Sequence, residues 1–221
     1  MDAHTGLEGK MTGPAAAGVA LRKPYVTPYA EESVDLPVTF EMAAGVPRLT
    51  YPDALSQEWM FGVLWARCGT ARAGTILWSK IHTLRQRRCM LKRLCRVCGG
   101  SAVDPETGRV WWVMASPLPG DHAETWPTVG PATCKGCVSE ALSACPYLPM
   151  ESPAVYTVGD CSPIGVLADI YGQDDDGRVM ETRHQAALGL DEFHLLHRAL
   201  ATQLIVQVHD LQPVPYPVNQ D

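Results

Sequence analysis

Two Cys-x-x-Cys pairs are the residues of this chain best suited to chemistry. Cys95 and Cys98 form the first pair, Cys134 and Cys137 form the second, and 35 residues separate the pairs. The short spacing points both sulfurs of a pair at one spot, and two pairs complete the tetrahedral thiolate shell that zinc prefers. We therefore predict that this four-cysteine cluster binds one Zn²⁺ ion. Because protein ligands fill every position, no open site remains for a reacting water, and the predicted zinc is structural.

Three local elements are expected to position these cysteines. The two glycines after the first pair allow the chain to curl there. A turn at residues 104–108 between two β-prone runs predicts a hairpin. Thr133 is the expected cap of a helix that carries the second pair and continues to about Ala144. Knuckle, hairpin and helix in this order are typical of a zinc treble clef.

The remaining candidate ligands have weaker patterns. His194 and His197 are three residues apart, with Asp191 one turn earlier, but exposed polar residues opposite an apolar stripe have the same spacing. We predict no metal site there. The other cysteines have no partner at ligand spacing: Cys68, Cys89, Cys145 and Cys161. Buried thiols or two disulfides are the alternatives to zinc at the four-cysteine cluster.

The charge of the chain is unevenly distributed. The net charge is -6, yet residues 60–103 hold nine of the 18 Lys and Arg residues and no Asp or Glu. A basic block beside a metal site indicates a polyanionic partner. The predicted nucleic-acid-binding residues cluster before and within the first cysteine pair: Arg85, Arg87, Arg88, Lys92, Arg93 and Arg96. The alternative is that they dock against acidic residues of this chain or of a partner protein.

Hydrophobic spacing predicts three helices around the cysteines. The first covers residues 54–68, with Asp53 as its cap, and the second runs from Gly74 or Thr75 to Leu94. The third starts at Asp191 and has an apolar face spaced by three or four residues: Phe193, Leu196, Leu200, Leu204, Val208 and Leu211. In the second helix, the predicted buried stripe consists of Leu77, Ile81, Leu84 and Leu91.

Strands are predicted at residues 155–158 and 165–171, followed by a turn at 172–177 and a returning strand at 178–183. The expected fold class is therefore α+β, with a zinc treble clef flanked by helices and a small C-terminal strand-plus-helix unit. The expected domains are a flexible or extended segment at 1–50, the helical zinc unit at 51–150, and a β-plus-helix unit at 151–221 packed on it.

Composition places the chain among globular proteins. It has 221 residues, of which 46% are hydrophobic and 19% charged, and no stretch is apolar for the length that a membrane span needs. The first 20 residues lack the basic start and apolar core of a signal peptide. We therefore expect a cytoplasmic protein, in whose reducing surroundings paired cysteines more often bind metal than form disulfides.

The run from Trp78 to Gly99, with its basic helix and Cys95-Arg96-Val97-Cys98-Gly99, resembles the opening of HNH endonucleases. Asp121-His122 lies between the two cysteine pairs, as the Asp-His of that family does. The chain departs from the family because no Asn precedes the second pair and Val138 replaces its final His. The resemblance covers about 60 residues and implies a related scaffold that lacks most of the catalytic set.

A broader resemblance, from about Pro47 to Leu211, is to a set of uncharacterised actinobacterial proteins and implies no known activity. The matching segments are Arg87-Arg88-Cys89-Met90, Cys95-Arg96-Val97-Cys98-Gly99, Val110-Trp111-Trp112-Val113, Cys134-Lys135-Gly136-Cys137, Val158-Gly159-Asp160 and Gly165-Val166-Leu167-Ala168-Asp169.

These observations favour a zinc-stabilised binding protein. The first hypothesis is a nucleic-acid-binding or regulatory protein that uses the basic helix before Cys95. The second is a protein-interaction or assembly module with a purely structural zinc. A degenerate nuclease comes third, since no nucleophile, base and orienting group stand at a meaningful spacing, and the sequence predicts no catalytic residue.

Overall fold

The structure, a computed structural model, describes residues 23–115, 124–144 and 152–216. Its elements in chain order are η1 (Ala30–Glu32), β1 (Thr39–Ala43), β2 (Val46–Thr50), η2 (Ser56–Glu58), β3 (Trp59–Met60), β4 (Val63–Trp65), α1 (Thr83–Lys92), β5 (Val110–Met114), β6 (Thr125–Thr128), η3 (Lys135–Cys137), α2 (Val138–Ala144), β7 (Ala154–Gln173), β8 (Val179–Gly189), α3 (Phe193–Leu196) and β9 (Ala199–Pro213). Strands account for most of this regular structure. No helix in these ranges is long and apolar enough to cross a bilayer.

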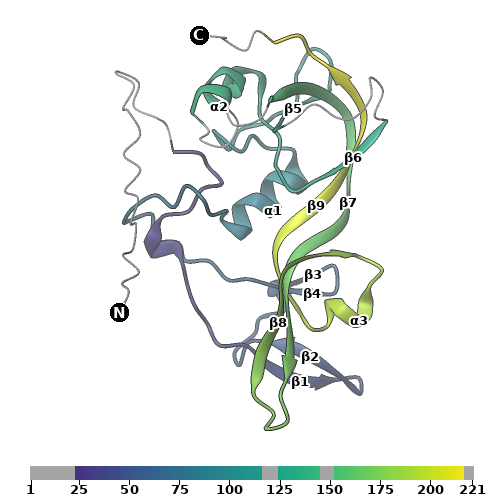
Figure 1. Ribbon diagram of the computed structural model, residues 1–221. Coiled ribbons are helices and arrows are strands. Elements are labelled where there is room, and N and C mark those ends of the chain that lie inside the picture. The colour runs from purple at the N-terminus through teal and green to yellow at the C-terminus, as the bar shows by residue number, and fades with distance from the viewer. Residues whose placement is uncertain (1–22, 116–123, 145–151, 217–221) are drawn as a thin grey trace, which may run out of the picture.

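Two long antiparallel strands, β7 and β9, form the spine of the main sheet (Figure 1). Each outer edge of this pair is completed by two shorter strands. β5 and β8 pair with β7, while β4 and β6 pair with β9, and β3 extends the sheet beyond β4. The seven-stranded sheet therefore takes strands from both sides of residue 150. β1 and β2 form a separate two-stranded sheet.

A side chain of α1 fills the gap between β4 and β6 on the edge of β9. Gln86 is fully buried, and its Nε2 donates to the carbonyl oxygens of Leu204 (2.9 Å) and Val129 (2.8 Å). Its Oε1 accepts the backbone N–H of Leu204 at 2.9 Å. The backbone of Leu204 thus finds in one side chain the partners that a neighbouring strand would otherwise supply. This contact fixes α1 against the middle of the sheet.

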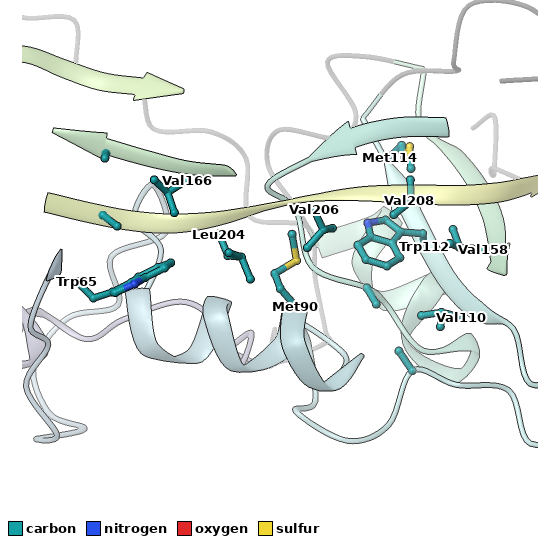
Figure 2. Close-up of a cluster of buried hydrophobic side chains, with 14 of the residues drawn as sticks. Trp65, Met90, Val110, Trp112, Met114, Val158, Val166, Leu204, Val206 and Val208 are labelled. Atoms are coloured by element: carbon teal, nitrogen blue, oxygen red, sulfur yellow. The ribbon is translucent and has the colours of Figure 1, made fainter. Parts of the chain in front are cut away.

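The main core lies between α1 and the sheet. Figure 2 shows Met90 of α1 beside Leu204 and Val206 of β9, with Trp65 on one side and Trp112 on the other. All five side chains are almost completely buried. The same core includes Cys95 and Cys137, so the four-cysteine cluster is built onto the main core and not onto a detached unit.

The helix expected from Asp191 onward is wrong. Only α3 is helical, and residues 199–213 form β9. A spacing of four residues is also a multiple of two, so Leu204 and Val208 share one face of a strand as they would share one face of a helix. Val206 between them is buried as well. A bulge at Thr202 lies between this run and the start of the strand.

The helix expected at 54–68 is also wrong, because this segment forms η2, β3 and β4. Phe61 and Gly62 both have positive φ (57° and 75°) and make the two-residue turn that joins β3 to β4. Trp59 pairs with Leu64 across this hairpin and packs with it in one cluster, whereas Met60, Val63 and Trp65 pack in the main core. Asp53, the expected cap, instead pairs with an arginine in the segment after β4.

The helix before Cys95 exists but is shorter than predicted and faces the other way. Only residues 83–92 are helical, and Ile81, Leu84 and Leu91 of the expected buried stripe are exposed. The buried side chains of α1 are Thr83, Arg85, Gln86, Cys89 and Met90. Hydrogen bonds of Gln86 and the ion pair of Arg85 with Glu32 offset part of the cost of burying these two polar side chains.

Several local predictions are confirmed. Both expected strands after residue 154 belong to β7, and β8 returns after a turn at residues 174–177. The hairpin turn at 104–108 is present, as is the helix that carries the second cysteine pair. The expected fold class, an α+β treble clef flanked by helices, is nevertheless wrong, because the molecule is a mostly β structure with one large mixed sheet. The proposed boundaries near residues 50 and 150 stay a prediction.

Replacing Gln86 tests its role on the edge of β9. Gln86→Leu keeps the approximate volume but leaves the backbone N–H and C=O of Leu204 unpaired inside the protein. We expect the free energy of unfolding to fall by about 2–4 kcal/mol, since each unsatisfied buried group costs about 1–3 kcal/mol. Denaturant unfolding measures this change. Gln173→Leu, at an exposed end of β7, is the control, and equal effects of the two variants would contradict the assignment.

Candidate metal centre

The first cysteine pair lies on a tight knuckle directly after α1. Arg93 ends the helix in the left-handed conformation (φ 52°), which turns the chain toward the knuckle. The backbone N–H of Cys95 donates to the carbonyl of Gly100 at 2.7 Å, and that of Gly99 donates back to the carbonyl of Cys95 at 2.8 Å. Gly99 has φ 75°, and a Cβ there would lie 2.9 Å from the ring of Tyr25. Glycine is therefore required at this position.

The second pair lies at the start of a helix. Cys134 precedes η3 and Cys137 ends it, with the N–H of Cys137 donating to the carbonyl of Cys134 at 2.8 Å. The expected cap, Thr133, does not cap this helix, since its buried Oγ1 has no hydrogen-bond partner among the described residues. Its backbone N–H instead donates to the carbonyl of Trp111 in β5 at 2.9 Å.

Backbone hydrogen bonds connect the two segments that carry the pairs. The N–H of Arg96 in the knuckle donates to the carbonyl of Ala132 at 2.8 Å, just before the second pair. On its other side, the knuckle pairs with the N-terminal segment, where the N–H of Tyr25 donates to the carbonyl of Val97 at 2.9 Å. The relative position of the pairs is therefore set by the backbone as well as by any bound ion.

The geometry of the four sulfurs fits one metal ion. All four donor atoms lie within 4.8 Å of one another. The Sγ atoms of Cys98 and Cys134 are 3.8 Å apart, which is the edge of a sulfur tetrahedron around a zinc ion with bonds of about 2.3 Å. That distance is far longer than a disulfide bond, and all four cysteines are free thiols. The four cysteines are close enough to bind a metal ion.

Burial changes the acidity of the thiols in this cluster. It raises the pKa of the Cys134 thiol to about 11, and it also raises the pKa of Cys137. At Cys98 burial acts in the same direction, but hydrogen bonds from the Gly100 N–H and from neighbouring thiols outweigh it and leave the pKa lowered. Burial thus favours the thiol forms of Cys134 and Cys137, and a metal ion bound at the cluster would displace their protons into solvent.

The other cysteines lie outside the cluster. Cys89 is fully buried beneath it, and its Sγ lies 3.9 Å from the carbonyl oxygen of Cys95. Burial raises the pKa of the Cys89 thiol to about 12, so it stays protonated and packs as an apolar group. Cys68 and Cys161 belong to neither pair. Cys145 lies outside the described residues.

The six predicted nucleic-acid-binding residues do not share one surface. Arg85 is buried and pairs with Glu32, and Arg93 pairs with Asp160. The guanidinium of Arg87 stacks on the ring of Trp65, with 4.4 Å between Cζ and the ring centroid. Arg96 is half-buried in the knuckle, which leaves Arg88 and Lys92 as the exposed members. Binding to nucleic acid itself stays a prediction.

Of two further candidates from the sequence, the structure describes only the histidine pair. His194 and His197 do not belong to a group of three metal-binding side chains within the described ranges. Asp121 and His122, on which the nuclease resemblance depends, lie outside the described residues. Comparison of the chain with protein-family models, with curated proteins and with solved structures finds no match.

Removing one ligand tests the centre. Cys95→Ser and Cys134→Ser should each lose the metal and lower the free energy of unfolding by several kcal/mol, because binding energy at a structural zinc is folding energy. A chelating dye measures the released metal, and denaturant unfolding measures stability. Cys68→Ser, at a half-buried cysteine outside the cluster, should change neither. Full metal content in both ligand variants would contradict the four-thiolate assignment.

Proposed function

We propose that this protein is a binding module in which a structural zinc ion at the four-cysteine cluster stabilises the fold and the outward face of α1 binds a protein partner. Zinc is the ion best suited to four thiolates in a tetrahedron. Four protein ligands leave no coordination position for a substrate, which favours a structural ion. The proposal for partner binding rests on one observation: α1 buries polar side chains and exposes apolar ones.

The outward face of α1 combines apolar and basic side chains. Trp78 and Ile81, just before the helix, are each 39% exposed, and Leu84 and Leu91 are each 41% exposed. Three exposed basic residues lie among them: Lys80, Arg88 and Lys92. Residues 84, 88 and 91 are spaced by four and three, so they follow one line along the helix. We call these seven residues the outer face of α1.

The fold prevents this face from turning inward. Gln86 is held by the backbone of Leu204, and Arg85 pairs with the buried Glu32 while its Nη1 donates to the carbonyl oxygen of Thr27. Rotating the helix to bury Leu84 would break these contacts and expose the core residue Met90. The exposure of the apolar side chains is thus imposed by specific polar contacts.

A protein partner fits this face better than a nucleic acid does. Exposed large apolar side chains that lie together are characteristic of protein-binding surfaces, and Trp and Arg are enriched among residues that contribute most to binding. Phosphate binding needs several free cations, and Arg85, Arg87 and Arg93 are engaged within the chain. We propose a partner segment with apolar residues flanked by Asp or Glu, which would complement Leu84 and Leu91 together with Arg88 and Lys92.

Nucleic acid is the second candidate, supported by the exposed Arg88 and Lys92. The two candidates differ in their dependence on charge. Phosphate contacts weaken steeply with salt, by an order of magnitude or more between ~50 and ~200 mM if several are made. Apolar contacts at Leu84 and Leu91 would not weaken in this way.

Substitution of the apolar residues separates these candidates. With Leu84→Ser/Leu91→Ser as bait in a quantitative affinity capture from source cells, we expect loss of the partners retained by the natural chain, while zinc content stays unchanged. Met42→Ser is the matched control, since Met42 is 69% exposed on the distant β1–β2 hairpin. Gel-shift assays with DNA and RNA should show no complex at ~150 mM salt. Unchanged capture by the double variant, or a shift that Arg88→Gln/Lys92→Gln abolishes, would contradict the proposal.

A further inference from the structure

A second group of side chains that could hold a metal ion lies on the β7–β8 hairpin. It consists of Asp169 on β7 and of Glu181 and His184 on β8. In Figure 1 this hairpin occupies the opposite end of the molecule from α2, which follows the second cysteine pair of the four-cysteine cluster. Glu181 and His184 are three residues apart, but Asp169 precedes them by 12 residues, so no local pattern in the sequence joins all three.

Irregular pairing brings these three side chains together. Residues three apart on a regular strand, such as Glu181 and His184, point to opposite faces of the sheet. Here Tyr171 pairs with Glu181, but Ile170 pairs with Arg183 and Ala168 with Ala186, so β8 has an extra residue at two places. His184 thereby comes opposite Asp169 while Glu181 stays opposite residue 171. Residues 169 and 171 share one face of β7, so all three donors gather on that face.

The irregularity in pairing between Ala168 and Ile170 also holds the side chain of Asp169 in place. Gln185 has φ 48°, a conformation that a residue with a side chain adopts at a cost. In this position its backbone N–H donates to Oδ1 of Asp169 at 2.8 Å. The side chain of Asp169 is only 15% exposed, whereas that of His184 is 67% exposed. One donor is therefore held firmly by the backbone, and the other two lie on the solvent side.

The two donor distances from His184 fit neighbouring positions around an octahedral ion, and all three donor atoms lie within 4.8 Å of one another. Nδ1 of His184 lies 3.0 Å from Oδ1 of Asp169 and 3.0 Å from Oε1 of Glu181. A cation with bonds of about 2.1 Å and angles near 90° places neighbouring donors about 3.0 Å apart, within the bond lengths usual for imidazole and carboxylate ligands. One imidazole and two carboxylates are a donor set suited to first-row divalent metals. Within the described chain, neither carboxylate forms a salt bridge with a Lys or Arg side chain.

We propose that Asp169, Glu181 and His184 form a second, solvent-accessible binding site for a divalent first-row metal ion such as Zn²⁺. The three side chains bind one face of the ion, and water completes its coordination on the exposed side. His184 binds the ion through the lone pair of Nδ1, because imidazole is a ligand only through a deprotonated nitrogen. Open positions make this site an exchangeable one, in contrast to the four-cysteine cluster. It does not depend on the proposed function of α1.

Calorimetric titration of Zn²⁺ into protein whose four-cysteine cluster is already loaded tests this proposal. The natural chain should bind one further equivalent, and His184→Ala and Glu181→Gln should each weaken that step by at least about tenfold. His194→Ala is the matched control, because His194 is an exposed histidine near Asp191 that lies in no such group, and it should bind as the natural chain does.

A second readout follows the imidazole itself. Addition of Zn²⁺ should shift the ¹⁵N resonance of His184 Nδ1 in proportion to the second equivalent, with little change at Nε2. The first equivalent and the circular dichroism spectrum of each variant show that the fold is retained. Absence of a second equivalent, a second equivalent that survives His184→Ala, or one lost with His194→Ala would each overturn the proposal.

Discussion

Four thiols held together in a largely buried place are the constraint on which the structure around α1 depends. Burial alone favours the protonated forms, as the raised pKa values of Cys134 and Cys137 indicate, and four packed thiol groups provide little cohesion by themselves. A bound divalent cation would reverse this balance, since thiolate bonds to a structural zinc supply folding energy. Because Cys95 and Cys137 belong to the main core, that energy would stabilise the sheet as well as the knuckle.

The metal centre and the sheet are connected through α1. The helix ends at the first cysteine pair, and in its middle Gln86 replaces a strand on the edge of β9. These two attachments fix the axial position and the rotation of the helix. They leave Leu84 and Leu91 outside, so the surface proposed for partner binding is a consequence of polar contacts made on the buried side.

The sequence is informative where spacing has one physical meaning and misleading where it has two. The paired cysteines predicted a cluster that is close enough to hold a metal ion. The Asp-rich turn at 174–177 predicted the hairpin formed by β7 and β8. Spacing of four along β9 fits both a helix and a strand, and tertiary pairing with β7 decided the outcome. The rotation of α1 depends on the hydrogen bonds between Gln86 and Leu204, which are 118 residues apart in the sequence. The contact between Asp169 and His184 depends on bulges in the pairing of β7 with β8. No local sequence pattern predicts either contact.

X-ray absorption at the zinc edge, combined with elemental analysis of the purified protein, tests the central claim most directly. Our account predicts one tightly bound zinc per chain, surrounded by four sulfur atoms at about 2.3 Å. A folded protein that contains no metal would contradict it. So would a tightly bound ion whose shell includes nitrogen or oxygen, because a residue other than the four cysteines would then complete the site.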